Sequence, residues 1–284
     1  MTAGTTTTCN VRPKVHVLGT EIDALTMDIA LDRIAQQLQD PRPAYVCVTG
    51  VHGVVEAMRN PALAEAYAHS AMNVPDGMPL VWVGRQQGHT HMKRVAGPDL
   101  MLEVFRDKRF ADVRHYLYGG DDGVARELRN RLQVQCPHAR IVGTYTPPFR
   151  PLSAEERTAF IEDVKRAKPD ILWIGISCPK QEIFMAEMLP LLDVRLMFGV
   201  GAAFDYHTGR IRDCAEWIKL CGLQWLHRLL QNPRRLWRRY LRNNPIFLWH
   251  ITLQLLSLRQ YPLTKSLAVT DTKRRGAIDA PTRS

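Results

Sequence analysis

The feature that most constrains the fold is the alternation of short β-rich runs with longer segments of helical periodicity. Short apolar runs rich in β-branched and aromatic residues are typical of buried strands. We expect strands at 15–18, 45–48, 115–118, 171–174 and 196–200, and helices at 26–38, 53–70, 123–135, 153–167 and 180–191. This order predicts the α/β class, with a Rossmann-like, mostly parallel sheet that is covered by helices on both faces.

The positive charge of the chain is concentrated near its C-terminal end. Lys and Arg number 38 against 28 Asp and Glu, which gives a formal net charge of +10. Nine of the cations lie in residues 217–270, a stretch without an acidic residue, so the remainder is nearly neutral. We expect a flexible N-terminus at 1–13, a Rossmann-like domain at 14–208, a basic amphipathic helical appendage at 209–260 and a disordered tail at 261–284.

Cysteine usage and the length of apolar runs indicate the cellular compartment. The six cysteines include no Cys-x-x-Cys pair, and no His pair has zinc-ligand spacing, so a reducing compartment is the simpler interpretation. Residues 1–10 lack the cationic and apolar regions of a secretory signal. The longest apolar stretch, 246–258, is shorter than the about 18 residues that span a bilayer. We therefore expect a cytoplasmic protein.

The loops after the expected strands contain the residues most suited to a binding site. In open parallel sheets, ligands bind beyond the carboxyl ends of the strands. Glycine also serves ordinary turns, but several glycine loops at one sheet edge favour a phosphate- or nucleotide-sized ligand. The chain lacks Gly-x-Gly-x-x-Gly after the first strand and has no P-loop, which weighs against dinucleotide oxidoreductases and P-loop enzymes. The loops in question are 49–50, 75–77, 119–123, 143–145, 175–179 and 199–201.

Several sequence blocks stand in a characteristic order along the chain. They are VLGTEIDALT at 17–26, VPDG at 74–77, RVAGPDLM at 94–101, PDILWIG at 169–175, CPKQE at 178–182, GVGAAFD at 199–205, GLQWLHR at 222–228 and PRRLWRRY at 233–240. With these blocks, which extend over roughly residues 15–248, the chain resembles the WecG/TagA/CpsF glycosyltransferases.

The resemblance implies an inverting hexosyltransferase of cell-surface polysaccharide synthesis. Such enzymes move a sugar, often N-acetylmannosamine, from a UDP-sugar donor to a polyprenyl-diphosphate-linked saccharide acceptor at the inner face of the plasma membrane. The chain has no Asp-x-Asp motif of the kind that holds a divalent ion in many nucleotide-sugar transferases, so we expect no metal and no cofactor. The resemblance also leaves a homo-oligomer open.

Two alternatives remain for the function. The chain departs from the family pattern at 48–52, which lacks the usual Asn, at 213–214, where Asp-Cys replaces Ala-Pro, and at Gln224, where Glu is usual. One alternative that these departures leave open is a different donor, such as UDP-glucose or another UDP-hexose in exopolysaccharide assembly. The alternative from another class is a non-catalytic protein that binds a nucleotide sugar or a nucleic acid.

Asp76 and Arg94 are the expected catalytic residues. Asp76 matches the base proposed for the family, which would accept the proton of the acceptor hydroxyl, although Asp-Gly is also a common turn dipeptide. Arg94 matches an arginine placed to meet phosphate or acceptor, and a forked guanidinium suits a diphosphate. A solvated basic turn is an equal explanation for Arg94. 

The expected substrate-binding residues come from the same loops and from the basic C-terminal segment. Gln181 and Asp205 match family positions for the nucleotide sugar, and Tyr145 would provide a stacking surface. Arginines would offset the charge of the diphosphate. A capped helix start is the alternative for Gln181, although the resemblance favours binding, and an ordinary apolar loop explains Tyr145 equally well. The full set is Thr49, Gly50, Tyr145, Gly175, Gln181, Gly201, Asp205, Arg212 and Arg228.

The mixture of Arg with Trp and Tyr in residues 217–258 is typical of a helix that lies in a lipid headgroup layer. A helix packed on its own core and a nucleic-acid patch are the alternatives. No nucleic-acid-binding module accompanies the segment, so we expect an anionic membrane surface as partner and no nucleic acid.

Overall fold

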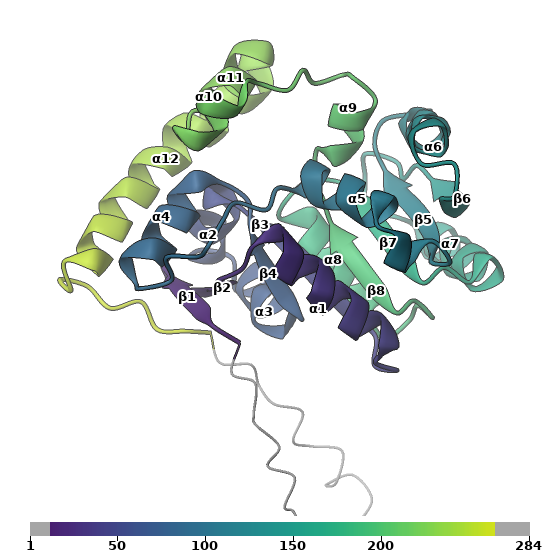
Figure 1. Ribbon diagram of the computed structural model, residues 1–284, viewed down its shortest axis with the longest axis horizontal. Coiled ribbons are helices and arrows are strands. Elements are labelled where there is room, and N and C mark those ends of the chain that lie inside the picture. Colours follow the sequence, from purple (N-terminus) through teal and green to yellow (C-terminus); the bar gives the residue numbers. More distant parts are fainter. Residues whose placement is uncertain (1–11, 265–284) are drawn as a thin grey trace, which may run out of the picture.

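The computed structural model describes residues 12–264 of the chain, which form a parallel sheet surrounded by helices (Figure 1). The sheet has six strands in the order β4-β3-β8-β7-β5-β6, and every neighbouring pair is parallel. The expected α/β class is thereby confirmed. The strands are β3 (Ala44–Thr49), β4 (Met72–Pro75), β5 (Arg114–Gly119), β6 (Arg140–Tyr145), β7 (Ile171–Gly175) and β8 (Leu196–Gly199).

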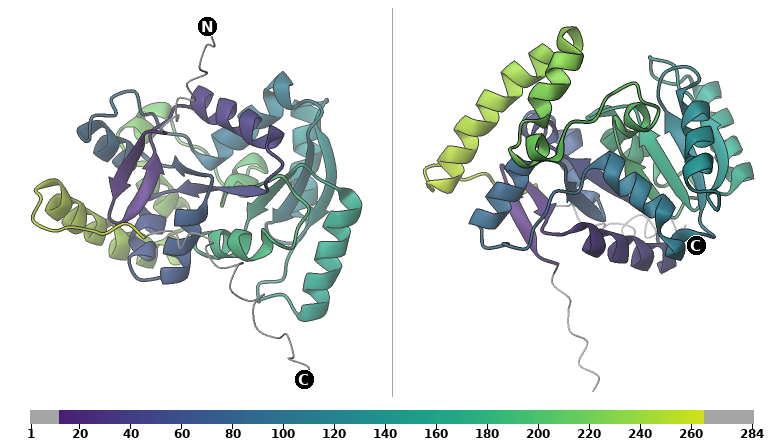
Figure 2. Two further views of the ribbon diagram at one scale, coloured as in Figure 1. Left: turned by 90° about the horizontal axis from the view of Figure 1, so that it is seen from below. Right: turned by 45° about the horizontal axis from the view of Figure 1, so that its top comes forward.

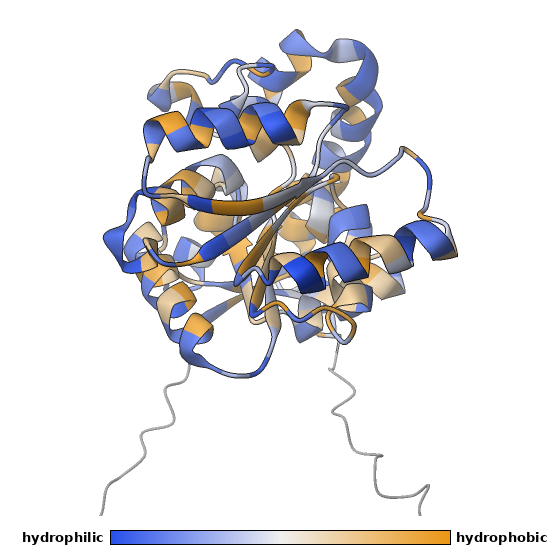
Figure 3. Cartoon of the chain, turned by 90° about the vertical axis from the view of Figure 1, so that its right-hand side faces the viewer, coloured by the Kyte–Doolittle hydropathy of each residue, from blue (hydrophilic) through white to orange (hydrophobic). Residues whose placement is uncertain are grey.

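Helices cover both faces of this sheet because its strands are apolar on both sides (Figures 2 and 3). In β5, Leu117 points into one core, whereas Tyr116 and Tyr118 point into the other. The first core contains residues of α1 (Met27–Gln39), α5 (Gly97–Arg106), α6 (Val124–Gln135) and α9 (Ala203–His207). The second contains residues of α3 (Pro61–His69), α7 (Ala154–Ala167) and α8 (Lys180–Met188). A short 3-10 helix, η1 (Lys108–Phe110), follows α5.

A third core joins the N-terminal hairpin to the C-terminal helix. Strands β1 (Lys14–Val17) and β2 (Thr20–Asp23) pair antiparallel and pack with α2 (Val51–Ala57) and α4 (Met78–Gln86). The long helix α12 (Pro233–Leu255) crosses α2 and α4 and buries Phe247 and Ile251 in this core (Figure 1). Its Gln254 side chain also bonds the hairpin, accepting from the Leu18 N–H at 2.7 Å. The C-terminal helix is therefore packed on the protein's own core along its second half.

Two short helices, α10 (Glu216–Leu220) and α11 (Gln224–Gln231), precede α12. They extend over the carboxyl ends of the strands at the top of Figure 1. Within residues 12–264, no helix is both long enough and apolar enough to cross a bilayer. Of the two expected flexible ends, Arg12 and Pro13 are described, as are 261–264, where Tyr261 is buried in the third core. The rest of those two segments lies outside the described residues.

One expected strand lies in a different sheet, and two other expectations about individual elements were wrong. The strand expected at 15–18 is present as β1, but it belongs to the separate hairpin, because the chain reverses at Gly19, whose φ of +88° favours glycine. The helix expected at 53–70 is two helices, because Asn60 caps α3 and Pro61 begins it. The loop expected at 143–145 is the end of β6. There a Cβ on Gly143 would overlap the ring of Tyr116, so this glycine serves packing between strands.

Candidate functional site

A cavity of about 1600 Å³ lies over the carboxyl ends of the central strands. Its floor is made by the loops that follow β3, β4, β5, β7 and β8, and its roof by α10, α11 and α12. Within the sheet, β4 lies on one side of β3, whereas β5, β6, β7 and β8 all lie on the other side of β3. The cavity thus occupies the crevice at the reversal of strand order, the usual ligand position in sheets of this kind.

Asp76 is fixed at the carboxyl end of β4 and faces the cavity. Its backbone N–H donates to the Thr49 carbonyl at 2.8 Å, and Gly77, at φ +133°, turns the chain into α4. The Asp76 carboxylate is 38% exposed and lies 4.0 Å from an Arg94 nitrogen. Its surroundings raise the pKa of Asp76 because they desolvate the anion, and the positive charges of Arg94 and Arg228 oppose this rise. A carboxylate with a raised pKa is a stronger proton acceptor.

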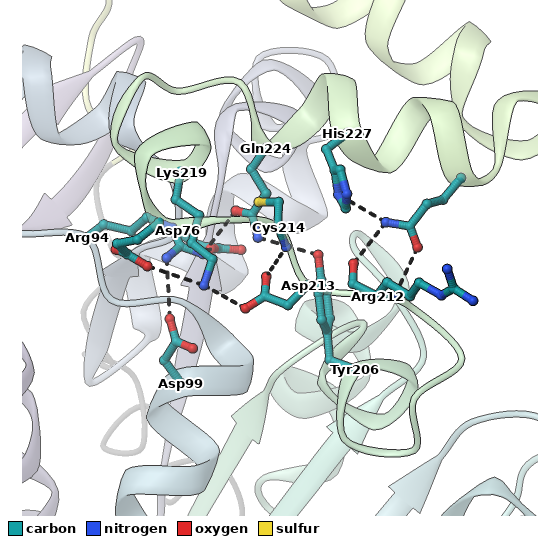
Figure 4. Close-up of polar contacts among 12 residues, drawn as sticks. Asp76, Arg94, Asp99, Tyr206, Arg212, Asp213, Cys214, Lys219, Gln224 and His227 are labelled. Carbon is teal, nitrogen blue, oxygen red and sulfur yellow. Dashed lines mark hydrogen bonds and ion pairs between the residues drawn. The ribbon is translucent and has the colours of Figure 1, made fainter.

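Arg94 is held by residues from two different parts of the chain (Figure 4). Its Nη1 donates to Asp99 at the start of α5 at 3.3 Å, and its Nη2 donates to Gln224 on α11 at 2.9 Å. Gln224 in turn donates to the Tyr206 hydroxyl at 3.4 Å. The helices of the C-terminal segment therefore contribute directly to the surroundings of Asp76.

The opposite half of the cavity is built by glycine loops and by Gln181. The Gln181 side chain is 2% exposed, accepts from the Gly201 N–H at 3.0 Å and donates to Glu182 at 3.0 Å. Gln181 thus fixes the loop after β8, in addition to lining the cavity. At Gly175 a Cβ would overlap the Phe204 ring, so the loop after β7 needs glycine to pass α9.

Asp205 on α9 also lines this half of the cavity. Burial raises the pKa of Asp205, and the nearby Asp121 adds to the rise. Arg235, Arg210 and Arg228 oppose it through their positive charge. Asp205 therefore supplies hydrogen-bond acceptors at the edge of a positively charged region.

Three arginines from the C-terminal helices face the cavity: Arg228, Arg235 and Arg239. The Arg228 guanidinium lies 5.6 Å from the centre of the Tyr206 ring. Among residues 12–264, none of the three forms an ion pair with a carboxylate, although Arg210 nearby pairs with Glu127 at 2.5 Å. Guanidinium groups that lack a carboxylate partner and face a cavity are suited to bind a diphosphate.

The structure brings most of the expected site residues together, but three lie outside the cavity. Thr49 is buried and its hydroxyl donates to the Cys47 carbonyl at 3.3 Å. Tyr145 stacks on Tyr118 in the second core, with ring centres 5.5 Å apart. Arg212 is exposed, and its guanidinium points away from Asp76 (Figure 4). The expected residues that line the cavity are Gly50, Asp76, Arg94, Gly175, Gln181, Gly201, Asp205 and Arg228.

A polar cluster on the cavity wall was not predicted from the sequence. The Tyr67 hydroxyl lies 3.7 Å from the Cys178 sulfur, and His52 pairs with Asn243 of α12 at 2.5 Å. Glu182 is fully buried, and burial raises its pKa to about 7. Only the dipeptide Gln181-Glu182 at an expected helix start pointed to part of this cluster. Nothing in the basic helix singled out Asn243.

The arrangement of possible metal ligands bears on the chemistry of the site. Within the described part of the chain, no three side chains of His, Cys, Asp or Glu lie close enough together to hold a metal ion. The described residues that could neutralise a bound diphosphate are the cavity-lining arginines, Lys180 and backbone N–H groups.

Comparison with known proteins shows which family this chain is similar to. The family described as "Glycosyl transferase WecG/TagA/CpsF family" matches residues 15–261. A Bacillus subtilis (strain 168) protein named N-acetylglucosaminyldiphosphoundecaprenol N-acetyl-beta-D-mannosaminyltransferase is 27% identical over 168 residues, which cover 59% of this chain and 63% of the relative. A Bacillus spizizenii protein of the same name is 26% identical over 204 residues, which cover 72% of this chain and 77% of the relative. The match thus spans less than two thirds of the first relative's length.

Proposed function

Because the chain belongs to the WecG/TagA/CpsF glycosyltransferase family, we propose that it is an inverting hexosyltransferase that uses a UDP-sugar. The acceptor in this proposal is a saccharide linked to a polyprenyl diphosphate. The observation that carries it is the position of Asp76, a carboxylate that faces the same cavity as three arginines that have no carboxylate partner among the described residues.

In the proposed reaction, Asp76 accepts the proton of the acceptor hydroxyl as that oxygen attacks the anomeric carbon. The new glycosidic bond forms on the face opposite the departing UDP, so a single displacement inverts the anomeric centre. The bond between the anomeric carbon and the diphosphate oxygen breaks, and its electron pair leaves with UDP. Arg228, Arg235 and Arg239 stabilise the negative charge that develops on the diphosphate.

The two halves of the cavity suit the two substrates. The loops at the ends of β5, β7 and β8 line one half with Gly120, Gly175 and Gly201, which suits a nucleotide, and Asp205 can accept hydrogen bonds from ribose hydroxyls. The half beside β4 holds Asp76 and takes the acceptor. The names of both relatives favour N-acetylmannosamine as the transferred sugar.

We also place the protein at the inner face of the plasma membrane. Trp217, Trp237 and Trp249 are exposed on the C-terminal helices, and the Arg238 guanidinium lies 5.3 Å from the centre of the Trp237 ring. Exposed apolar side chains next to arginines are typical of a surface that contacts anionic lipid. Each basic residue near such a surface contributes about 1 kcal/mol, so a few suffice for reversible attachment.

The decisive experiment is a transfer assay with purified protein, a panel of UDP-sugars and a synthetic polyprenyl-diphosphate N-acetylglucosamine acceptor. We expect one UDP-sugar to give a β-linked disaccharide product with inverted anomeric configuration, in buffer containing EDTA. UDP alone should raise the Tm under the same conditions, whereas a single-stranded oligonucleotide should not. A retained configuration, or no product from any UDP-sugar, contradicts the proposal.

The membrane position has its own test. We expect the protein to sediment with vesicles that contain anionic lipid and to stay in the supernatant with purely zwitterionic vesicles. Binding should weaken as salt is raised, because the attraction is electrostatic. Equal binding to both kinds of vesicle would contradict an anionic surface as partner.

A further inference from the structure

The cavity continues beyond Asp76 as a groove between α4 and α12. We define the α4–α12 groove by Trp82 and Val83 on α4 and by Phe247, Leu248, Ile251 and Leu255 on α12, all of which line the same cavity as Asp76. We propose that this groove binds the first isoprene units of the acceptor's polyprenyl chain, an inference that rests on the proposed function.

The cavity-lining residues of α12 change in character along the helix. Its first half contributes both cations, Arg235 and Arg239, together with Leu236 and Tyr240, and the amides Asn243 and Asn244 follow. Beyond the amides every cavity-lining residue of the helix is apolar. From Arg235 to Leu255 the helix rises about 30 Å, of which Phe247 to Leu255 accounts for about 12 Å. This wall therefore offers both of its cations at the end where the diphosphates meet and only hydrocarbon at the far end, where an apolar tail finds a matching surface.

The position of Asp76 sets the direction in which such a molecule lies. If the reacting hydroxyl of the acceptor meets Asp76, the diphosphate on the same saccharide extends along α12 past Arg235 and Arg239, which face the departing UDP, toward Asn243 and Asn244. The lipid is bonded to that diphosphate, so it continues into the groove. On α4 the only cation at the groove is Arg85 among the described residues, and its Nε already donates to the Met92 carbonyl at 3.1 Å. The distal groove thus suits a hydrocarbon chain better than a second phosphate.

The exposed apolar side chains of the groove also favour a bound apolar ligand. Leu248 is 63% exposed and Leu255 is 40% exposed, although both line a cavity next to the fully packed third core. Apolar side chains gathered in an open groove gain free energy when a hydrocarbon covers them. Trp249, Leu256 and Leu258 are exposed near the end of the groove, where the remainder of a long chain would pass into the bilayer.

The first experiment compares two acceptors that carry the same diphosphate-linked N-acetylglucosamine, one on undecaprenol and one on a short alkyl chain. It uses the full-length protein in detergent and the double variant Leu248→Gln/Leu255→Gln. We expect the ratio of kcat/KM for the long acceptor over the short acceptor to fall about tenfold in the variant, from the lost apolar contact. The KM for the UDP-sugar should not change.

Leu241→Gln is the matched control, because Leu241 is also 63% exposed on α12 but does not line the cavity. In detergent its acceptor ratio should equal that of the wild type. An unchanged ratio in Leu248→Gln/Leu255→Gln, or an equal fall in Leu241→Gln, would overturn the proposal. A change in sedimentation coefficient confined to the double variant would instead assign the groove to a second copy of the chain.

The second experiment separates this proposal from the proposed function. A polyprenyl diphosphate with a photoreactive diazirine on an early isoprene unit is cross-linked to the wild-type protein without donor. We expect labelled peptides from α4 and from the second half of α12, and competition by unlabelled undecaprenyl diphosphate. Label elsewhere on the protein refutes the groove even if transfer is observed. Label in the groove with no transfer to any acceptor supports a polyprenyl site and contradicts the hexosyltransferase.

Discussion

Arg94 donates to the side-chain oxygen of Gln224 at 2.9 Å, although the two residues are 130 positions apart in the chain. The bond joins the segment before α5 to α11, and Arg94 also lies 4.0 Å from Asp76. Arg94 is 12% exposed, and its Nε has no hydrogen-bond partner among the described residues. The orientation of this arginine beside the proposed base therefore depends on a helix of the C-terminal segment.

Replacing Gln224 should alter the pH dependence of transfer. In Gln224→Glu, the new carboxylate partly neutralises Arg94, whose positive charge otherwise lowers the pKa of Asp76. The pKa of Asp76 should rise further, so the acidic limb of kcat/KM against pH should move to higher pH. In Gln224→Ala, Arg94 loses one partner, and kcat/KM should fall about tenfold. A pH profile in Gln224→Glu that coincides with the wild type would show that Gln224 has no electrostatic influence on Asp76.

Asp76→Asn should abolish most of the transfer and preserve donor binding. An amide cannot accept the proton of the acceptor hydroxyl, and loss of a general base costs about 10²- to 10⁴-fold in kcat. UDP should still raise the Tm of this variant, because the glycine loops and arginines are unchanged. Asp112→Asn is a suitable control, since Asp112 is exposed and far from the cavity lining. Turnover of Asp76→Asn within a few-fold of the wild type would remove Asp76 from the mechanism.

The wild-type pH profile follows from the same carboxylate. The base is active when deprotonated, and its pKa in the folded protein is raised above the ordinary 3.8. As pH falls through that raised pKa, Asp76 becomes protonated and kcat/KM should decrease with a slope of one. The acidic limb should be absent from the residual activity of Asp76→Asn. A limb that persists there belongs to another group.

Arg239 and Arg242 lie on the same helix, but only Arg239 lines the cavity. Arg239→Gln should lower kcat about 10- to 100-fold, because one of the charges that stabilise the departing diphosphate is lost. The affinity for UDP should fall in parallel, as measured by calorimetry. Arg242→Gln in detergent is the control and should behave as the wild type. Equal effects of the two substitutions would mean that the basic segment acts only through its total charge.

The strands of the main sheet could be predicted from sequence because buried parallel strands are continuous apolar runs. The same signal could not separate 15–18 from the sheet, since a hairpin strand packed on α4 and α12 has an equally apolar pattern. No residue range was predicted for β2, β4 or β6, because β2 and β4 have only four residues each and all three strands include polar ones. What decided their pairing was tertiary contact rather than local pattern.

The candidate site was predictable only to the level of its loops. Asp76 and Gly201 follow strands whose carboxyl ends meet, so topology brings them together once the sheet is known. The direction in which a side chain points within a loop could not be predicted from the topology. Thr49 turns inward and Arg212 turns outward, although both stand close to residues that do line the cavity. The pairing of Gln224 with Arg94 depends on how α11 packs over the sheet, which no local pattern determines.

Glu182 should make the protein less stable as pH rises. Its pKa is raised by burial from an ordinary 4.5 to about 7, so between these pH values the folded state keeps a proton that the unfolded state has lost. The free energy of unfolding therefore decreases as pH rises through this window and levels off above it, a change on the order of 3 kcal/mol. Glu182→Gln keeps a neutral side chain in the same place and should remove this contribution.

Urea unfolding at pH 5 and pH 8 measures the change in the free energy of unfolding, with Glu162→Gln on the surface of α7 as control. If Glu182→Gln loses as much stability between the two pH values as the wild type does, Glu182 is already ionised in the folded protein, and the polar cluster around Cys178 and Tyr67 must solvate its charge.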